Sequence, residues 1–399
     1  MSVNKFFYWF WIIYLPTCVL FYHRVWDYID ETMTLVLLLF TITKAISRIP
    51  KNTGKEISAY LILMLFYVAY SAVLKVNSFP AVLYDLQQQV RPYVVFYCTY
   101  ILAPQFTKKQ QKRLIIWFIV CCVSYFFIGG RYGSYENPAI GQATLVTATM
   151  YIMFNGDGKR FAWRALAILT LGLLSAKAKF FGEYVVFIAL FIMLKSRLKP
   201  NLKTIVSVSA LIIAIVFFTW EKFNAYYVEG MEENVSKNER KARPESFKTA
   251  RTIIFNDYIP FGSGLASFGT NAAAKYYSPL YYKYGLNDIW GLYPENPMFV
   301  ADAFYPVLAQ YGMLGLFFFL WFWLRRYKTA IFLREFKLYK VAMMMIFAIL
   351  LEAMADTSYL SGKGMGYFML LAMALRNYTT KNNYRLINAD DNDRNTTEE

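Results

Sequence analysis

Apolar residues gather in runs along nearly the whole chain, and most runs have the length of a membrane-spanning helix. About 20 apolar residues cross a bilayer as a helix, and the runs here have roughly 15 to 22. They predict twelve spans, at 6–22, 33–49, 57–74, 92–106, 114–130, 139–155, 162–176, 180–195, 204–220, 303–324, 340–356 and 364–376. The pattern therefore predicts an all-α polytopic membrane protein whose integral membrane domain covers 1–376.

Two segments depart from this pattern. Residues 221–302 form one long polar stretch between spans, which predicts a single large extramembrane loop. The tail 377–399 is rich in Asn, Asp and Thr and has no apolar face to bury, so we expect it to be disordered. The first apolar run follows Lys5 without a small-residue cleavage site, which favours a retained span over a cleaved signal peptide.

The distribution of basic residues predicts the orientation. Lys and Arg in short loops are retained on the cytoplasmic side. Of the 42 basic residues, 26 fall on one side of the predicted spans, seven fall in the opposite short loops and nine lie in 221–302. Both termini are therefore predicted to be cytoplasmic and the long loop to lie outside. The net charge of +16 is explained by this retention, without a nucleic-acid partner.

Cysteine and histidine usage narrows the possible chemistry. All four cysteines lie inside apolar runs, so neither a CxxC metal site nor a disulfide framework is indicated. The only histidine is His23, which removes His-based metal sites and a Ser-His triad elsewhere in the chain. The sequence therefore predicts no metal site and no cofactor.

The basic residues on the outer side are the first candidates for function, because they are there despite the topological bias. Arg91 lies at the expected start of a helix, Arg131 at the expected end of one, and Lys177 and Lys179 in a tight SAKAKFFG turn. Together with Arg251 of the long loop they could form a basic pocket at the membrane–water boundary. A lipid-linked diphosphate would sit at that depth, and arginine binds phosphate oxygens in pairs. The alternative is that these side chains snorkel or bind phospholipid head groups.

Two of the arginines precede a glycine by a similar distance. Ten residues separate Arg251 from Gly262, and nine separate Arg131 from Gly141. The segment PFGSGLASFG, which contains Gly262 and Gly264, could aim backbone N–H groups at an anion or let a bulky lipid approach the main chain. Most glycine-rich turns only shape loops, so this alternative stays open.

The long loop and its end supply further candidates. Tyr258 is one of nine tyrosines there, which could stack on sugar rings or anchor the loop at the interface. Asp302, at the mouth of the span 303–324, could accept a proton from a sugar hydroxyl or pair with an arginine. Glu295 is an alternative base.

Two glutamates fall inside predicted spans. Glu183 and Glu352 are candidates because an ionisable group is costly in an apolar environment. Pairing with Lys177 or Lys179 would give Glu183 a structural role instead.

These features together resemble the O-antigen polymerase and O-antigen ligase family of bacterial surface-polysaccharide assembly. The resemblance covers about residues 115–325. It rests on the segments RYGSYENPAIGQATLV, SAKAKFFG, PFGSGLASFG after Arg251, and ADAFYPVLAQYGMLGL. It implies a GT-C-like fold and a metal-independent, inverting transfer of a glycan from undecaprenyl diphosphate to an acceptor hydroxyl. The reaction would take place on the periplasmic side of the bacterial cytoplasmic membrane, with membrane lipid, a flippase and a chain-length regulator as partners.

The resemblance also implies roles for single residues. Arg131 and Arg251 match the arginines of the family's paired arginine–glycine motifs, and Lys179 stands near a position where the family often has a Ser-Arg pair. Asp302 falls where ligases usually carry histidine, which favours a polymerase over a ligase. Under this hypothesis Arg251, Arg131 and Asp302 are catalytic. The expected diphosphate- and glycan-binding residues are Arg91, Lys177, Lys179, Gly262, Gly264 and Tyr258.

A lipid-linked oligosaccharide flippase or another transporter is the alternative from a different class. Transporters place charges near the bilayer midplane and show internal repeats. The charges here crowd the outer face, and no repeat is evident, which favours the enzyme.

Overall fold

The computed structural model describes residues 1–20, 28–45, 49–132, 138–198 and 240–376, together with parts of 202–224. The predictions for the tail 377–399 and for most of the span 204–220 lie outside this part of the chain. The described residues are helical, with one isolated bridge between Tyr293 and Asn296 and no strand. The all-α prediction is confirmed for them.

Three described helical segments are long and apolar enough to cross a membrane, by length and composition: Val3–Leu20, Lys51–Leu74 and Phe336–Ala355. This is consistent with a membrane protein. The larger number of spans stays a prediction.

The first half of the chain forms a series of helices, each of which overlaps one of the apolar runs. They are α1 (Val3–Tyr14) with a π-helical extension Leu15–Leu20, α3 (Ile29–Ala45), α4 (Lys51–Leu74), α5 (Phe79–Leu102), α6 (Lys108–Tyr132), α7 (Pro138–Asn155), α8 (Lys159–Thr170) with a 3₁₀ extension Leu171–Ser175, and α9 (Ala178–Ile188) with a π extension Ala189–Met193.

The second half contains both short and long helices. They are α11 (Trp220–Phe223), α12 (Ala242–Thr252) with a π extension Ile253–Asp257, α13 (Asn271–Lys275), α14 (Leu280–Lys283), the 3₁₀ helix η8 (Tyr305–Gln310), α15 (Gly312–Ile331), α16 (Phe336–Ala355) and the 3₁₀ turn η9 (Gly362–Gly364). A last helix covers 365–376.

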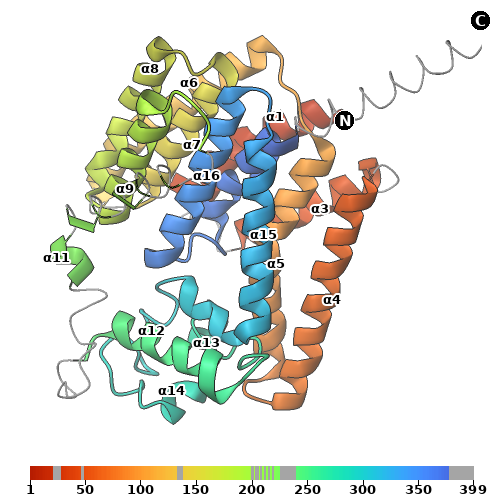
Figure 1. Ribbon diagram of the computed structural model, residues 1–399, viewed down its shortest axis with the longest axis vertical. Coiled ribbons are helices and arrows are strands. Elements are labelled where there is room, and N and C mark those ends of the chain that lie inside the picture. The colour runs from red at the N-terminus through yellow and green to blue at the C-terminus, as the bar shows by residue number, and fades with distance from the viewer. Residues whose placement is uncertain are drawn as a thin grey trace, which may run out of the picture.

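The helices are arranged as a bundle with a layer of short helices at one end. In Figure 1, α12, α13 and α14 lie together at the bottom of the molecule, and α4, α5 and α15 reach down to them. The N-terminus lies in the upper half, away from these short helices. We call residues 240–304 the α12–α14 layer.

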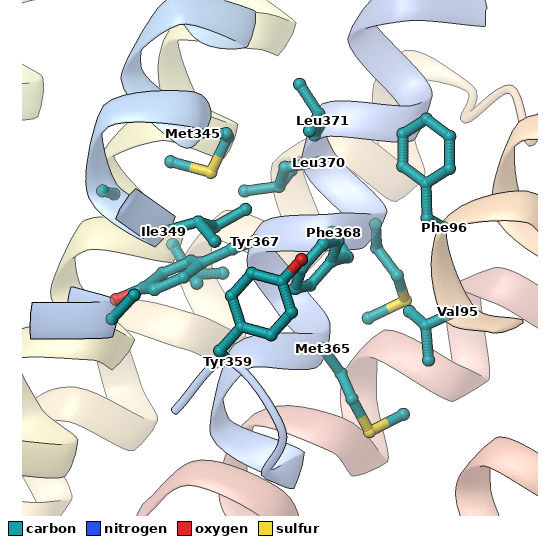
Figure 2. Close-up of a cluster of buried hydrophobic side chains, with 14 of the residues drawn as sticks. Val95, Phe96, Met345, Ile349, Tyr359, Met365, Tyr367, Phe368, Leu370 and Leu371 are labelled. Atoms are coloured by element: carbon teal, nitrogen blue, oxygen red, sulfur yellow. The ribbon is translucent and has the colours of Figure 1, made fainter. Parts of the chain in front are cut away.

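The core of the bundle surrounds the last helix. Figure 2 shows Phe368 and Leu371 of this helix among Val95 and Phe96 of α5 and Met345 of α16. All residues from 364 to 375 are buried. The loop 356–364, which connects α16 to this helix, is therefore fixed at both of its ends.

Helix α5 corrects one predicted boundary. The span was expected at 92–106, but α5 is continuous from Phe79 to Leu102 with Pro92 inside it. The prediction was wrong because the polar run before Pro92 reads as a loop, whereas Asp85, Gln88 and Gln89 are buried against other elements. Arg91 consequently lies within the helix and not at its start.

Helix α15 corrects a second boundary. The span expected at 303–324 begins only at Gly312, because residues 305–310 form the 3₁₀ helix η8. Gly312 has φ +57°, a left-handed conformation that interrupts the helical path. A Cβ atom on Gly312 would lie 2.3 Å from the amide nitrogen of Gly262, so the two glycines allow the two backbones to touch.

Candidate functional site

Lys179 lies at the centre of a buried group of charges where α9 and α16 meet. It follows the first residue of α9, and its side chain is 9% exposed. Its ammonium lies 3.1 Å from Oε2 of Glu352, in the last turn of α16, and also donates to the carboxylate of Asp356 just beyond that helix. The chain thus brings one cation and two carboxylates together from segments more than 170 residues apart.

Neutral polar groups complete this cluster. Gln142 of α7 donates from Nε2 to Oε2 of Glu352 at 2.6 Å and also donates to the hydroxyl of Ser358. Tyr367 donates its hydroxyl to Oε1 of Glu352 at 3.1 Å. The Gln142–Ser358 bond and the Lys179–Asp356 contact tie the start of the 356–364 loop to α7 and α9, and the Tyr367 bond ties the last helix to α16.

Asp302 and Arg243 form a second ion pair next to this cluster. Arg243, in the first turn of α12, donates from Nε to Oδ2 of Asp302 at 2.7 Å. Burial raises the pKa of Asp302, and the Arg243 charge acts in the opposite direction. The charges of Asp356 and Lys179 also act on Asp302, so both groups of charges share one region. That region is the junction between the α12–α14 layer and the bundle.

Asp356 is held in its ionised form. Burial works against its charge, but Lys179 and Lys363 more than offset this and hold the pKa of the carboxyl below its usual range. An ionised acceptor therefore lies beside Asp302 at this junction.

Arg91 is enclosed in a third network. It is 3% exposed, it forms ion pairs with Asp30 and Glu31 of α3, and it donates to the backbone oxygen of Leu360 at 2.9 Å. The amide of Gly362 donates to Oδ2 of Asp30 at 3.0 Å. Arg91 therefore fastens the later part of the 356–364 loop, and both of its terminal nitrogens donate to protein acceptors.

Two of the predicted phosphate-binding cations are accessible. Arg251, in the last turn of α12, is exposed, and Lys177 precedes α9 as its N-cap residue. Neither side chain makes a hydrogen bond or ion pair with the described residues. Arg131 lies in the last turn of α6, and its side chain is outside the described part.

The glycine-rich turn is engaged in packing. The amides of Gly262 and Gly264 donate to the backbone oxygens of Tyr258 and Gln310, at 2.7 and 2.9 Å. The amides of Leu265 and Ala266 donate to the side chains of Ser71 and Asp85, both at 2.7 Å. In this structure these N–H groups face inward, and the binding of substrate by Gly262 and Gly264 stays a prediction.

Gly141 also has a packing role. A Cβ atom on it would lie 2.7 Å from the ring of Phe180, which directly follows Lys179. The glycine that nine residues separate from Arg131 thus lets α7 and α9 approach each other at the charge cluster.

Tyr258 lies in an aromatic and charged patch of the layer. Lys283 donates to its hydroxyl at 3.2 Å and lies 4.7 Å from its ring centroid. Tyr284 donates to Asp257 at 2.6 Å, and Trp290 is 63% exposed. Such rings could stack on sugars, which the structure leaves as a prediction.

Sequence reasoning missed Arg243, Asp356, Gln142 and Ser358. Gln142, Asp356 and Ser358 are polar residues inside an apolar run or close to the end of one, and Arg243 is one of the basic residues of the long polar loop. These signals are shared by many residues of this chain. Only their partners distinguish them. The pairing of Asp302 with an arginine was foreseen as an alternative, and that arginine is Arg243.

In the described part of the chain, no group of three or more His, Cys, Asp or Glu side chains is placed to hold a metal ion. No protein-family model matches this chain, and no curated protein matches its sequence. The assignment of function therefore rests on the residues and on the geometry of this junction.

Proposed function

We propose that this protein is a membrane glycosyltransferase that polymerises undecaprenyl-diphosphate-linked oligosaccharide repeat units. The observation that carries the proposal is the junction itself, where the Arg243–Asp302 pair lies beside Lys179 and Asp356. Arg251 adds an exposed arginine on the same helix as Arg243. Transfer of a sugar from a lipid diphosphate needs cations that bind the diphosphate and a nearby carboxylate that accepts a proton, and this junction has both at the edge of a bundle.

The proposal includes the finer architecture. The chain would have about twelve spans in a GT-C-like arrangement, both termini in the cytoplasm and the α12–α14 layer on the periplasmic side of the bacterial cytoplasmic membrane. Flippase and chain-length regulator proteins would act before and beside it.

The proposed reaction is an inverting displacement. The acceptor hydroxyl oxygen forms a bond to the anomeric carbon, the bond from that carbon to the phosphate oxygen breaks, and the diphosphate leaves with the electron pair. Arg251 and Arg131 bind the diphosphate and stabilise its growing charge. Asp302 accepts the hydroxyl proton, and Arg243 orients Asp302.

An assay with purified protein tests this proposal. An undecaprenyl-diphosphate-linked repeat unit is incubated with the protein in detergent, with and without a lipid A-core acceptor, and the products are separated on a gel. A ladder of lipid-linked oligomers without the core supports a polymerase. Transfer that occurs only with the core supports the O-antigen ligase alternative.

A transporter is the second candidate, and a specific observation favours it. Lys179, Glu183 and Glu352 are ionisable groups that are buried or nearly buried within the helical bundle, as is common in ion- and proton-coupled transport. Absence of transfer with either acceptor would contradict the glycosyltransferase. Movement of the lipid-linked glycan across proteoliposomes would then establish the flippase.

A further inference from the structure

Glu183 is a buried acid whose charge is not compensated by hydrogen bonds. It lies one turn beyond Lys179 on α9 and is 1% exposed. Neither of its carboxyl oxygens accepts a hydrogen bond from the described residues, and Oε1 of Gln142 has no donor either. An ionised carboxylate in such a place would carry a large desolvation cost.

The carboxyl groups around Glu183 increase that cost, and the Lys179 ammonium reduces it. Glu352 lies next to it, Asp356 acts on it from the 356–364 loop, and Lys179 is the cation that faces it. Two tyrosines of the described residues also belong to this group: Tyr367 acts on both glutamates, and Tyr14 lies beyond it. Lys179 already contacts Glu352 and Asp356, so one ammonium faces three carboxyl groups.

The hydrogen bonds distinguish the two glutamates. Glu352 accepts from Lys179 at 3.1 Å, from Gln142 at 2.6 Å and from Tyr367 at 3.1 Å. Three donors stabilise its ionised form, whereas Glu183 has none from the described residues. Like charges so close together favour one proton shared by the pair.

We propose that Glu183 and Glu352 form a carboxyl pair that binds one proton inside the bundle, with the proton on Glu183. Binding converts one carboxylate to a neutral carboxyl group and needs no other reactant. In the protonated state Lys179 remains between Glu352 and Asp356. Loss of the proton adds a negative charge that draws Lys179 away from Asp356, which loosens the 356–364 loop beside Asp302. The proton site thus biases the junction, whether or not the protein transfers glycans.

Infrared spectroscopy of the full-length protein in detergent tests this proposal. At neutral pH we expect the wild type to show a protonated-carboxyl band that shifts in D₂O and is weaker in Glu183→Gln. Glu245→Gln is the matched control, because Glu245 is a buried glutamate that pairs with Arg240 at 2.6 Å and lies outside the proposed carboxyl pair. A wild type without the band overturns the proposal, even if the variant does not fold, and so does a band whose intensity is unchanged in Glu183→Gln.

The pH dependence of thermal unfolding gives an independent measurement. A folded state that keeps a proton which the unfolded state releases loses stability as pH rises. The wild-type midpoint should therefore fall with rising pH, and Glu183→Gln should have a flatter profile and a higher midpoint at alkaline pH. A wild-type midpoint that depends on sodium concentration and not on pH would mean that the pair binds a metal cation, and it would overturn the proposal of a bound proton.

Discussion

At the scale of single residues, Asp302 and Arg251 differ in whether other side chains of the protein already pair with them. Asp302 is bound to Arg243 and lies among other charges, whereas Arg251 is exposed and makes no ion pair with the described residues. An occupied carboxylate is held in a fixed position, and an unoccupied guanidinium is available to a ligand. Each property leads to a different test.

Arg251 should be required for activity, and the requirement should be for the planar guanidinium group and not only for its charge. Removing one group that stabilises the charge of a transition state typically lowers turnover by about 10²- to 10³-fold, and we expect this loss for Arg251→Ala. Arg251→Lys should also be impaired, because lysine keeps the charge but not the two-pronged donor. The measurement is the rate of polymer formation, with Arg325→Ala as the control at the far end of α15. Normal polymer from Arg251→Ala would refute its role.

Arg243 should control the pH at which Asp302 works. Burial raises the pKa of Asp302 and Arg243 lowers it, so Arg243→Ala should raise that pKa further. A base must be ionised, and activity should therefore fall on the acid side at a higher pH in Arg243→Ala than in the wild type. The measurement is kcat/KM against pH. An equal loss at every pH would mean that Asp302 is not the titrating base.

At the scale of elements, the glycine-rich turn docks the α12–α14 layer onto the bundle. Tyr67 donates to the backbone oxygen of Tyr311, and Tyr70 donates to that of Gly262 at 3.0 Å, so α4 supports both sides of the turn. The stability of the junction should therefore depend on this close approach.

Substitutions at two glycines distinguish the free-energy cost of the left-handed backbone conformation from the cost of close packing. Gly262 (φ +77°) has no room for a Cβ atom, whereas Gly285 (φ +60°) has nothing within 4 Å of one. We expect Gly285→Ala to cost about 1–2 kcal/mol for the left-handed conformation. Gly262→Ala should cost roughly 1–3 kcal/mol more, because of overpacking. Thermal unfolding of both variants gives the comparison, and equal midpoints would contradict the packing role.

The contact between α4 and α15 allows a similar comparison, between a partly exposed and a buried ion pair. Arg325 and Arg326 both pair with Glu56, but their side chains are 39% and 6% exposed. Breaking a buried pair typically costs about 3–5 kcal/mol, so Arg326→Ala should be strongly destabilising. Arg325→Ala should cost less than about 1 kcal/mol. Chemical or thermal unfolding distinguishes them, and a comparable loss in both would show that exposure does not decide the contribution.

At the scale of the whole molecule, the α12–α14 layer and the basic connection between α15 and α16 should face opposite sides of the membrane. The four native cysteines are buried, so a single introduced cysteine can report on each side. Asp288 of the layer and Glu335 before α16 are both exposed. In intact cells we expect an impermeant thiol reagent to label Asp288→Cys and not Glu335→Cys. Labelling of Glu335→Cys alone would invert the proposed topology.

The sequence by itself determined which segments become helices and which candidate residues are charged. Apolar runs predict helices because the need to bury a run can be recognised within its own segment. Helix α7, for example, begins within one residue of its expected start. The exceptions are instructive. Buried polar residues such as Asp85 concealed the first part of α5, and the left-handed Gly312 moved the start of α15.

Only the tertiary structure decided which charges meet. Asp302 pairs with a residue 59 positions away, Arg91 with one 61 positions away, and Lys179 with one 177 positions away. No local pattern encodes these pairs, because they depend on how distant helices pack. The same packing occupies Arg91 with carboxylates, turns the amides of Gly262 and Gly264 inward and leaves Arg251 accessible. A charge in a sequence becomes a candidate for function only when the fold shows whether it is already neutralised.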